Sequence, residues 1–422
     1  MYSFKRVDIN EINGFAENNG IYSQTFAWAE FRSIFKPVCF KGEDNSGNMV
    51  LSCILYLLPV YLTPYKIGYI TRGFVCDYNN YDLVNEFCDF IKNYAKKHFI
   101  VYTIFDPWVD FKIDFDEDNE NKKLIEIFEK NGFHRNSGHF MQPNTNYRLK
   151  IDANNDIDAE KKRLWNGFTQ KLRNDIQLSV DRGVECERFN GENLSQGVKV
   201  FYDLLVETTK KKGFGHRSEK YYQRFAKKLS KYVTIYLWKY NSEIDINYTK
   251  NIINDVTALL KKINDEIINP ETTNKKRERL GPKKRECEKQ LDATYKRLEI
   301  AEKYTHNPYI SASFYIKTGN KAYNLYGANS SALRELRLTA NYWDMIQDSL
   351  DNTVSTFNMG GTLKLDTNKL KDDAMYDLYL YKSLYNGEFV ELPGEFILIS
   401  RSKLFNLLHT KLNYFKRIVF KF

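Results

Sequence analysis

The sequence YISASFYIKTGNKAYNLY, residues 309–326, has the pattern of two strands joined by a tight turn. Residues 309–317 and 321–326 are rich in β-branched and aromatic side chains, which favour a pleated sheet. Between them lies Gly319-Asn320, a dipeptide that suits the two-residue turns of β-hairpins. We therefore expect a β-hairpin in the C-terminal half of the chain.

The elements expected around this hairpin occur twice along the chain in one order: a pair of strands, a helix, a strand and a helix. The clearest signals in the N-terminal half are an apolar stripe at helical spacing and, after it, a short apolar run. An internally duplicated protein of the mixed α/β (α+β) class is therefore expected. The first half is predicted to contain a helix at 23–35, strands at 49–59 and 66–72, a helix at 81–97, a strand at 99–105 and a helix at 121–131. The second half is predicted to contain strands at 232–240, 309–317 and 321–326, a helix at 342–351, a strand at 354–358 and a helix-like run at 375–385.

Residues 241–305 differ in character, because apolar positions recur there at spacings of three and four among densely charged residues. Pro270 and the Gly281-Pro282 pair mark the expected turn region. This pattern predicts an antiparallel coiled-coil hairpin that protrudes from the body as an arm. Its basic outer faces are either a solvated helical surface or a contact for the phosphates of RNA. The expected core positions are Ile252, Val256, Leu259, Ile263, Ile267, Cys287, Leu291, Tyr295 and Leu298.

The composition is that of a globular protein of two to three domains. The chain has 422 residues, of which 42% are hydrophobic and 15% aromatic. No apolar run reaches the roughly 18 residues of a membrane-spanning helix, and the first residues, MYSFKRVDIN, lack the layout of a signal peptide, so we expect a cytoplasmic protein. The net charge of +9 suits an anionic partner such as RNA, a pyrophosphate or an acidic membrane surface. Cysteines and histidines are scattered, so neither a metal site nor a disulfide is expected.

No familiar catalytic motif occurs, since the sequence lacks GxSxG, the phosphate-binding P-loop pattern and HExxH. A dispersed set of short stretches carries the candidates instead. They are SQTFAWAEFR (23–32), YITRGFVCD (69–77), FDP (105–107), LWNGFTQKLRNDIQLSVDRGV (164–184), GHRSEKYYQRF (215–225), YGANSS (326–331), FNMGG (357–361), YKSLYNG (381–387) and PGEF (393–396). Taken together and in this order, they resemble the Fem family of peptidoglycan-bridge aminoacyltransferases. The basic arm also lies where several members of that family carry a coiled-coil arm.

The resemblance implies a fold and a division into domains. The fold is a tandem of two acyl-CoA N-acyltransferase (GNAT)-like domains with the coiled-coil arm inserted, which agrees with the duplication inferred from the residues. Residues 1–147 together with 388–422 are expected to form domain 1. Residues 148–240 together with 306–387 are expected to form domain 2, and 241–305 the arm.

The resemblance also implies a reaction. An amine on the stem peptide of a peptidoglycan precursor, or on a residue already attached to it, attacks the ester carbonyl of aminoacyl-tRNA. The precursor is lipid II or UDP-MurNAc-pentapeptide, so peripheral contact with the inner face of the plasma membrane is expected. No cofactor is needed, because the ester is already activated and positioning supplies much of the rate.

Several alternatives stay open at this point. One is an acyl-CoA-dependent N-acyltransferase of the same fold, although the chain has only Gly360-Gly361 as a partial pyrophosphate loop. Another is a non-enzymatic adaptor that binds RNA or a protein partner through the arm. The amino acid transferred and the oligomeric state are also open.

Three residues of the C-terminal half are candidates for holding the precursor. Arg217 lies in a glycine-flanked loop that opens a helix, where a guanidinium can grip a phosphate with two hydrogen bonds. Tyr221 follows one helical turn later and can add a hydrogen bond from its hydroxyl. By resemblance, Arg217 and Tyr221 match residues that hold the muramyl-pentapeptide precursor, and Tyr326 matches another.

Two further candidates lie near the N-terminus. Arg32 follows Trp28 by about one helical turn and matches a basic, precursor-binding position of the family; the alternative is an ordinary surface arginine. Arg72 stands at the end of a strand beside Gly73, where guanidinium and backbone could both approach a phosphate. The family usually has Arg-Gly-Pro here, whereas this chain has Phe74, which puts the local turn in doubt.

Asp106 and Lys382 are the candidates for the chemical step. Asp106 ends a buried strand, where it could cap the turn, accept a proton from the attacking ammonium or orient substrate. Lys382 follows Tyr381 at the position of a family Phe-Lys motif, and its charge could stabilise the oxyanion of the tetrahedral intermediate. The alternative for Lys382 is a lysine that reaches solvent past its aromatic neighbours.

Lys171 and Arg173 belong to a basic stretch that is interleaved with Trp165 and Phe168. Such a stretch suits contacts with an RNA backbone and some stacking on bases. We therefore take Lys171 and Arg173 as candidates for binding tRNA, with a solvated amphipathic helix as the alternative.

Overall fold

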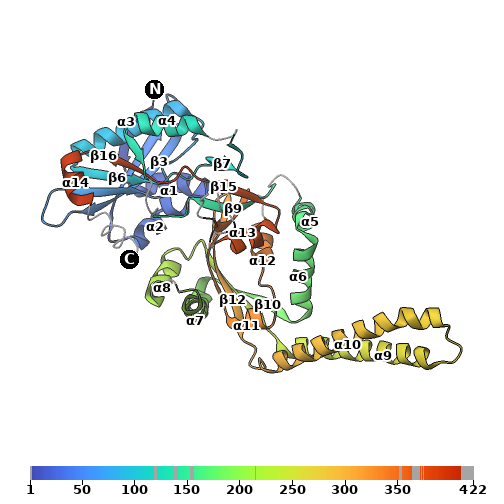
Figure 1. Ribbon diagram of the computed structural model, residues 1–422. Coiled ribbons are helices and arrows are strands. Elements are labelled where there is room, and N and C mark those ends of the chain that lie inside the picture. Colours follow the sequence, from blue (N-terminus) through green and yellow to red (C-terminus); the bar gives the residue numbers. More distant parts are fainter. Residues whose placement is uncertain are drawn as a thin grey trace.

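The computed structural model describes residues 2–117, 121–136, 141–152, 156–213, 215–350, 354–363, 371, 373 and 375–409. These residues form two mixed β-sheets with helices packed on them, and a long helical arm projects from one side (Figure 1). The predicted α/β class is therefore confirmed.

The first sheet has eight strands in the described residues, in the order β1-β2-β3-β4-β6-β16-β8, with β5 paired to β3. All neighbours are antiparallel except β4 and β6, which run parallel and are joined by helix α3. The strands are β1 (Ser3–Val7), β2 (Lys36–Glu43), β3 (Met49–Pro59), β4 (Lys66–Ile70), β5 (Val75–Cys76), β6 (Ile100–Phe105), β8 (Phe133–Arg135) and β16 (Phe396–Ile399). The helices of this half are α1 (Ile9–Asn18), the 3-10 helix η1 (Tyr22–Gln24), α2 (Phe26–Phe31), α3 (Tyr81–Lys97), α4 (Lys122–Lys130) and α14 (Ser402–His409).

The second sheet also has eight strands in the described residues, in the order β10-β11-β12-β13-β14-β9-β15-β7. Its one parallel pair, β13 and β14, again follows four antiparallel strands, so the order of the first sheet recurs. The strands are β7 (Lys112–Ile113), β9 (Thr145–Lys150), β10 (Val184–Phe189), β11 (Val233–Tyr240), β12 (Tyr309–Thr318), β13 (Lys321–Asn329), β14 (Thr356–Gly361) and β15 (Glu388–Glu391). The helices are α5 (Ile157–Gly167), α6 (Gln170–Asp181), η3 (Gly191–Asn193), α7 (Leu194–Lys212), α8 (Glu219–Lys228), α11 (Ser331–Glu335), α12 (Trp343–Ser349) and α13 (Tyr376–Ser383).

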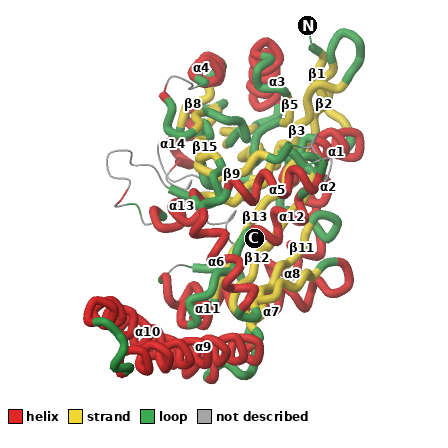
Figure 2. Tube along the Cα trace, turned by 90° about the vertical axis from the view of Figure 1, so that its right-hand side faces the viewer, coloured by secondary structure: helices red, strands yellow, loops and turns green. Residues whose placement is uncertain are grey.

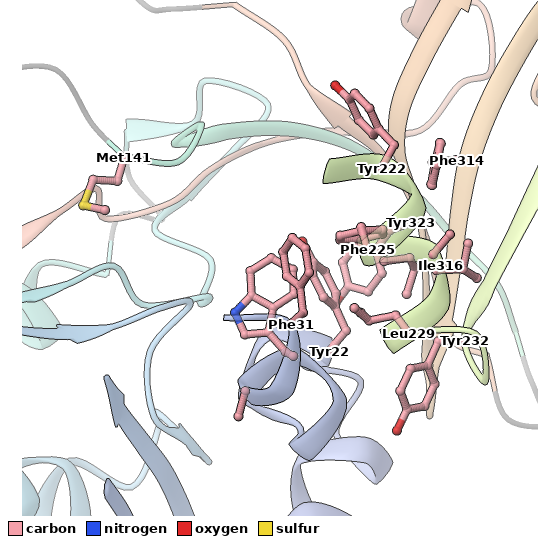
Figure 3. Close-up of a cluster of buried hydrophobic side chains, with 14 of the residues drawn as sticks. Tyr22, Phe31, Met141, Tyr222, Phe225, Leu229, Tyr232, Phe314, Ile316 and Tyr323 are labelled. Carbon is pink, nitrogen blue, oxygen red and sulfur yellow. The ribbon is translucent and has the colours of Figure 1, made fainter. Parts of the chain in front are cut away.

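The two sheets, with the helices packed on each, are connected by strands and by a common hydrophobic core. Strand β7 lies in sequence between β6 and β8 of the first sheet, and β15 directly precedes β16 of that sheet, yet both β7 and β15 pair within the second sheet. A single buried cluster joins the halves: Trp28 and Phe31 of α2 pack on Phe225 of α8 with ring centroids 6.1 and 5.2 Å apart. Figure 3 shows Tyr22 and Phe31 facing Phe225, Leu229 and Tyr323 across this junction. The halves are therefore held together by a packed core.

The arm consists of α9 (Ser242–Ile268) and α10 (Asn274–Glu302), which lie side by side in both views (Figures 1 and 2). Its own small core contains Val256, Ile263, Leu280 and Cys287. At its base, Arg182 is buried against Asp245 with a nitrogen–oxygen distance of 2.8 Å. The arm thus has a separate apolar core and a buried ion pair that ties it to the body.

Three local expectations were wrong. The turn of the arm lies at 269–273, and Gly281-Pro282 is inside α10, where packing of Leu280 and Cys287 on α9 outweighs the helix-breaking tendency of proline. Leu259 and Tyr295 are 49% and 50% exposed, so they are not core positions. The helix expected at 23–35 is only η1 and α2, because Thr25 caps α2 by accepting a hydrogen bond from the N–H of Trp28.

Candidate active site between the two sheets

A cavity of about 280 Å3 lies where the carboxyl ends of the two parallel strand pairs meet. Thr71 and Arg72, just after β4, line it from the first sheet, and Gly360 and Gly361, at the end of β14, line it from the second. Ligands of α/β proteins commonly bind outside the carboxyl ends of parallel strands. The cavity is therefore the first candidate for an active site.

All five side chains that the sequence predicts to hold a precursor line this cavity. They come from separate parts of the chain: the end of α2, the loop after β4, the loop before α8, α8 itself and β13. The residues are Arg32, Arg72, Arg217, Tyr221 and Tyr326. Three guanidinium groups in one cavity suit an anionic group of a ligand, and phosphate most of all.

Arg72 is held in an uncommon conformation by Asp106. Its φ of 54° is in the left-handed region, and its backbone N–H donates to Oδ1 of Asp106 at 2.9 Å. The guanidinium lies 3.7 Å from Oδ2 of Asp106, donates to the carbonyl oxygen of Pro143 at 3.0 Å, and covers the ring of Trp108 at 4.4 Å. The carboxylate of Asp106 thus orients Arg72 from the side away from the cavity, and Asp106 does not itself line the cavity.

The environment of Asp106 changes its acidity. Burial raises the pKa of Asp106 to about 7, although the charge of Arg72 and the hydrogen bond from its backbone act in the opposite direction. The carboxyl can therefore change its protonation state near neutral pH.

Phe74, which stands where the family usually has proline, fills the first core. Its ring stacks on Phe105 with centroids 5.3 Å apart and meets the edge of Phe87 at 4.7 Å. The preceding Gly73 has φ +77°, and a Cβ there would lie 2.4 Å from the hydroxyl of Tyr78. The turn after Arg72 is thus set by Gly73, and Phe74 anchors it in place of proline.

Arg32 and Arg217 approach the cavity from the two halves. Arg32 is 7% exposed, lies over the ring of Phe35 at 5.1 Å, and has a pKa lowered by burial. Arg217 precedes α8, whose first turn is capped by Ser218, and its guanidinium covers the ring of Tyr221 at 4.7 Å. Both guanidinium planes are thus oriented by aromatic rings.

The two tyrosines form one polar and aromatic wall. Tyr221 packs edge-on against Phe31, with centroids 5.2 Å apart, and its hydroxyl hydrogen-bonds to that of Tyr326. Burial raises the pKa of Tyr326, so its hydroxyl stays neutral and can donate or accept.

Lys382 lies behind the end of β14 and does not line the cavity. Its ammonium donates to the carbonyl oxygens of Gly360 at 3.0 Å and Gly361 at 2.8 Å, and the side chain is 2% exposed. Burial lowers the pKa of Lys382 to about 7. Gly360 has φ +82°, and a Cβ there would lie 2.9 Å from the carbonyl oxygen of Asn324 on β13. The lysine therefore sets the path of the backbone that forms the cavity wall.

Lys171 and Arg173 lie apart from the cavity, on α6 over the opposite face of the second sheet. Lys171 is exposed. Arg173 donates to the carbonyl oxygens of Asn166, at 3.0 Å, and of Phe168, which end α5. Thr169, the cap of α6, donates its N–H to the carbonyl oxygen of Leu384 at 3.0 Å, so this region adjoins α13 and Lys382.

A larger cavity, of about 910 Å3, lies elsewhere between the halves. Four of its five charged residues form two ion pairs, Lys231 with Glu17 at 3.0 Å and Arg188 with Asp348, and the charge of Asp348 also acts on the fifth, Lys317. A cavity whose charges are already neutralised offers less to an ionic ligand, so we do not place the active site there.

Sequence reasoning missed several residues of the smaller cavity, chiefly Trp108, Asn146 and Asn358. The amide nitrogen of Asn146 has no hydrogen-bond partner in the described residues although the side chain is 4% exposed. An asparagine in a short strand signals nothing by its spacing. Only the pairing of β9 with β14 and β15 brings it to the cavity.

Comparison with known proteins identifies the family of this chain. The model of the FemAB family matches residues 8–411. The chain belongs to the FemAB family. The resemblance to the Fem family drawn from the short motifs is thus confirmed.

Proteins similar to this FemAB-family chain were found both by sequence and by structure. Lipid II:glycine glycyltransferase of Staphylococcus aureus is 26% identical over 399 residues, which cover 92% of this chain and 90% of that protein. The same enzyme from strain USA300 has the same identity and coverage. A crystal structure of FemX superposes with a TM-score of 0.68 at 22% identity, covering 96% of this chain and 99% of that one, which establishes a common fold.

None of the described helices is both long and apolar enough to cross a membrane. Within the same residues, no group of three or more histidine, cysteine, aspartate or glutamate side chains is arranged to hold a metal ion.

Proposed function

We propose that this FemAB-family chain is an aminoacyltransferase of peptidoglycan cross-bridge synthesis. It moves an amino acid from aminoacyl-tRNA to an amine on the stem peptide, or on the growing bridge, of a peptidoglycan precursor. The observation that carries this proposal is the gathering of Arg32, Arg72 and Arg217 in one cavity at the ends of both parallel strand pairs.

The precursor occupies this cavity. Its diphosphate binds the three guanidinium groups, and the hydroxyls of Tyr221 and Tyr326 take further polar groups of the muramyl peptide. A relative acts on lipid II according to its name, so the precursor is lipid II or its UDP-linked form. With lipid II as acceptor, the protein works as a cytoplasmic enzyme in peripheral contact with the inner face of the plasma membrane, where its net charge of +9 favours anionic lipid.

The chemistry is aminolysis of an ester, which needs no cofactor. Lys382 holds Gly360 and Gly361 through hydrogen bonds from its ammonium, and from behind this wall its positive charge stabilises the oxyanion that forms on the ester carbonyl. Asp106 serves the reaction through Arg72, whose backbone and guanidinium it orients. Most of the rate then comes from holding amine and ester together with water excluded.

The tRNA approaches from the side of α6 and the arm. Lys171 contacts the RNA backbone there, and Arg173 keeps α5 and α6 in place beside it. This side adjoins α13, which carries Lys382, so the acylated end of the tRNA reaches the cavity at Gly360-Gly361. The basic outer faces of α9 and α10 extend the same surface.

The fold that serves this function is a tandem of GNAT-like domains. The recurrence of four antiparallel strands followed by a parallel pair supports that assignment. Domain 1 comprises 1–147 with 388–422, domain 2 comprises 148–240 with 306–387, and 241–305 form the arm as a coiled coil. Strands β7 and β15 of domain 1 then complete the sheet of domain 2.

The proposal is tested by comparing transfer from two kinds of acyl donor. The purified protein is incubated with UDP-MurNAc-pentapeptide and either charged tRNA or an acyl-CoA, both labelled in the acyl group. Label is expected in the precursor only with charged tRNA. Transfer from acyl-CoA alone would replace the proposed donor and leave the fold assignment standing.

A further inference from the structure

A second cavity of about 280 Å3 adjoins the first, and the proposed function does not use it. The two cavities share four lining residues: Trp108, Asn146, Tyr323 and Asn358. The ring of Trp108 lies edge-on to Tyr323, with centroids 5.5 Å apart. One molecule can therefore extend from the arginine-lined cavity into the second one along a common wall.

The floor of the second cavity is one face of the second sheet. Three adjacent strands each contribute alternate residues to it, as the two-residue period of a strand requires. The intervening residues Ala322, Phe357 and Tyr147 belong to the apolar core on the other face. The floor residues with polar groups are Lys321 and Tyr323 of β13, Thr356 and Asn358 of β14, and Asn146 and Arg148 of β9. Buried polar groups normally have hydrogen-bond partners, so a floor that includes the amide nitrogen of Asn146, unpartnered among the described residues, suits a polar ligand.

Among the described residues, Lys321 carries the one charge of this floor that has no ion-pair partner. Arg148 is held by Asp110 at 2.6 and 2.8 Å and by Glu388 at 3.0 Å. The charge of Asp110 acts on Lys321, but burial has the larger effect and lowers the pKa of Lys321 to about 8. The ammonium is thus still mainly protonated at neutral pH, and the carboxylate that acts on it, Asp110, is itself paired with Arg148.

Two donors mark the ends of the floor. Lys321 pairs with Thr356, and Thr356 pairs with Lys150, so Lys321 lies level with Lys150 in the sheet. Asn146, whose amide nitrogen has no partner in the described residues, lies four residues further along β9, next to the arginine-lined cavity. The two donors are thus about 13 Å apart along the strands and two strands apart across the sheet, a separation of about 16 Å that about five residues of extended peptide span.

We propose that the second cavity binds the peptide part of the acceptor, with its carboxylate end paired to Lys321 and its backbone bonded to Asn146. The inference rests on the proposed function, in which the arginine-lined cavity takes the diphosphate of the same molecule. It adds a recognition site for the far end of the acceptor and assigns Lys321 as the residue that selects a free carboxylate.

The observations favour the acceptor over a phosphate of the donor RNA. The floor of the second cavity faces away from α6 and α13, which cover the opposite face of the sheet. Its shared wall with the arginine-lined cavity instead makes it continuous with the precursor site.

The test compares two acceptors that differ only at the C-terminus: a muramyl pentapeptide with a free carboxylate and the same molecule with a carboxamide. Each is titrated calorimetrically against the full chain without tRNA, and each is then assayed for the KM of transfer. The variants are Lys321→Met and Lys321→Arg. The matched control is Lys150→Met, because Lys150 lies level with Lys321 but is 64% exposed and paired with Glu388.

With the wild-type chain and Lys150→Met, the carboxamide is expected to raise Kd and KM roughly tenfold to a hundredfold, the loss typical of a charged hydrogen bond. Lys321→Met should bind both acceptors equally weakly, and Lys321→Arg should restore the preference. Equal binding of both acceptors by the wild-type chain would overturn the inference. The inference would also be overturned if the Lys321→Met substitution raised only the KM for charged tRNA. Absence of all transfer, with the calorimetric preference intact, would refute the proposed reaction and leave the carboxylate site standing.

Discussion

Asp106 and Arg72 meet at the carboxyl ends of β6 and β4, where Oδ1 of the aspartate accepts the backbone N–H of the arginine at 2.9 Å. The same carboxylate lies 3.7 Å from the guanidinium through Oδ2. One side chain thus stabilises both the left-handed backbone of Arg72 and the direction of its charge. Because Asp106 lies outside the lining of the cavity, its effect on a bound ligand passes through Arg72.

Asp106→Asn should therefore act mainly on binding. The amide oxygen can still accept the N–H of Arg72, but the charge facing the guanidinium is lost. We expect the KM for the precursor to rise about tenfold, as for loss of one charged interaction, with kcat within about threefold of the wild type. Steady-state kinetics with varied precursor measure this. A fall in kcat of about a hundredfold or more, with KM unchanged, would instead identify Asp106 as the base.

The pH dependence of stability offers an independent check on Asp106. Its folded pKa, about 7, is above the unfolded value of 3.8, so between these values the unfolded chain has lost a proton that the folded chain keeps. Stability is then greatest below the unfolded pKa and falls as pH rises toward 7, by about 1.4 kcal/mol per unit. Urea unfolding from pH 4.5 to 7.5 should show this fall in the wild type and a shallower one in Asp106→Asn. Parallel curves would mean that the pKa of Asp106 is not raised.

Lys382→Met should act on the chemical step. The variant keeps a long apolar stem but removes the ammonium that holds Gly360 and Gly361. We expect kcat to fall about a hundredfold or more, which is the range for loss of a group that stabilises the oxyanion of the transition state. The KM for the precursor should change little. Ser383→Ala, on the same helix, is the control. Because the pKa of Lys382 is about 7, wild-type kcat should also decline as pH rises through that value. An unchanged kcat in Lys382→Met would remove Lys382 from the chemistry.

The arm can be shortened without disturbing its base. Asp245 pairs with Arg182, and Arg297 donates to Thr249 at 3.1 Å, so a deletion of 252–293 closed by a short glycine-serine link preserves these contacts. Because the arm has its own core, the melting temperature of the body should stay within a few degrees. The KM for charged tRNA should rise as basic residues are lost, while precursor binding stays unchanged. A folded variant that has lost every activity would instead favour the alternative that the chain is a non-enzymatic adaptor, which binds RNA or a protein partner through the arm.

Local sequence patterns predicted a helix or strand well where the spacing of its apolar residues was clear and turn residues stood at both of its ends. Strand β3 and helix α3 have the predicted bounds, since apolar runs and stripes are bounded by turn residues on both sides. Patterns failed where packing overrides propensity, as at Gly281-Pro282 inside α10. The five precursor residues were found by their motifs, but their common cavity depends on how the two halves pack. Asn146 and Lys321 could not be found, because each is a single polar residue whose role depends on neighbours in other strands.

The most direct measurement of the central claim is the mass of the precursor before and after incubation with the protein and tRNA charged with each amino acid in turn. The account predicts a gain of one amino-acid residue from one kind of charged tRNA, in an amide that survives mild base. It also predicts that Arg217→Ala abolishes the gain at low precursor concentration, whereas the exposed Lys220→Ala on α8 does not. An unchanged mass with every charged tRNA, from folded protein that binds the precursor, would contradict the claim.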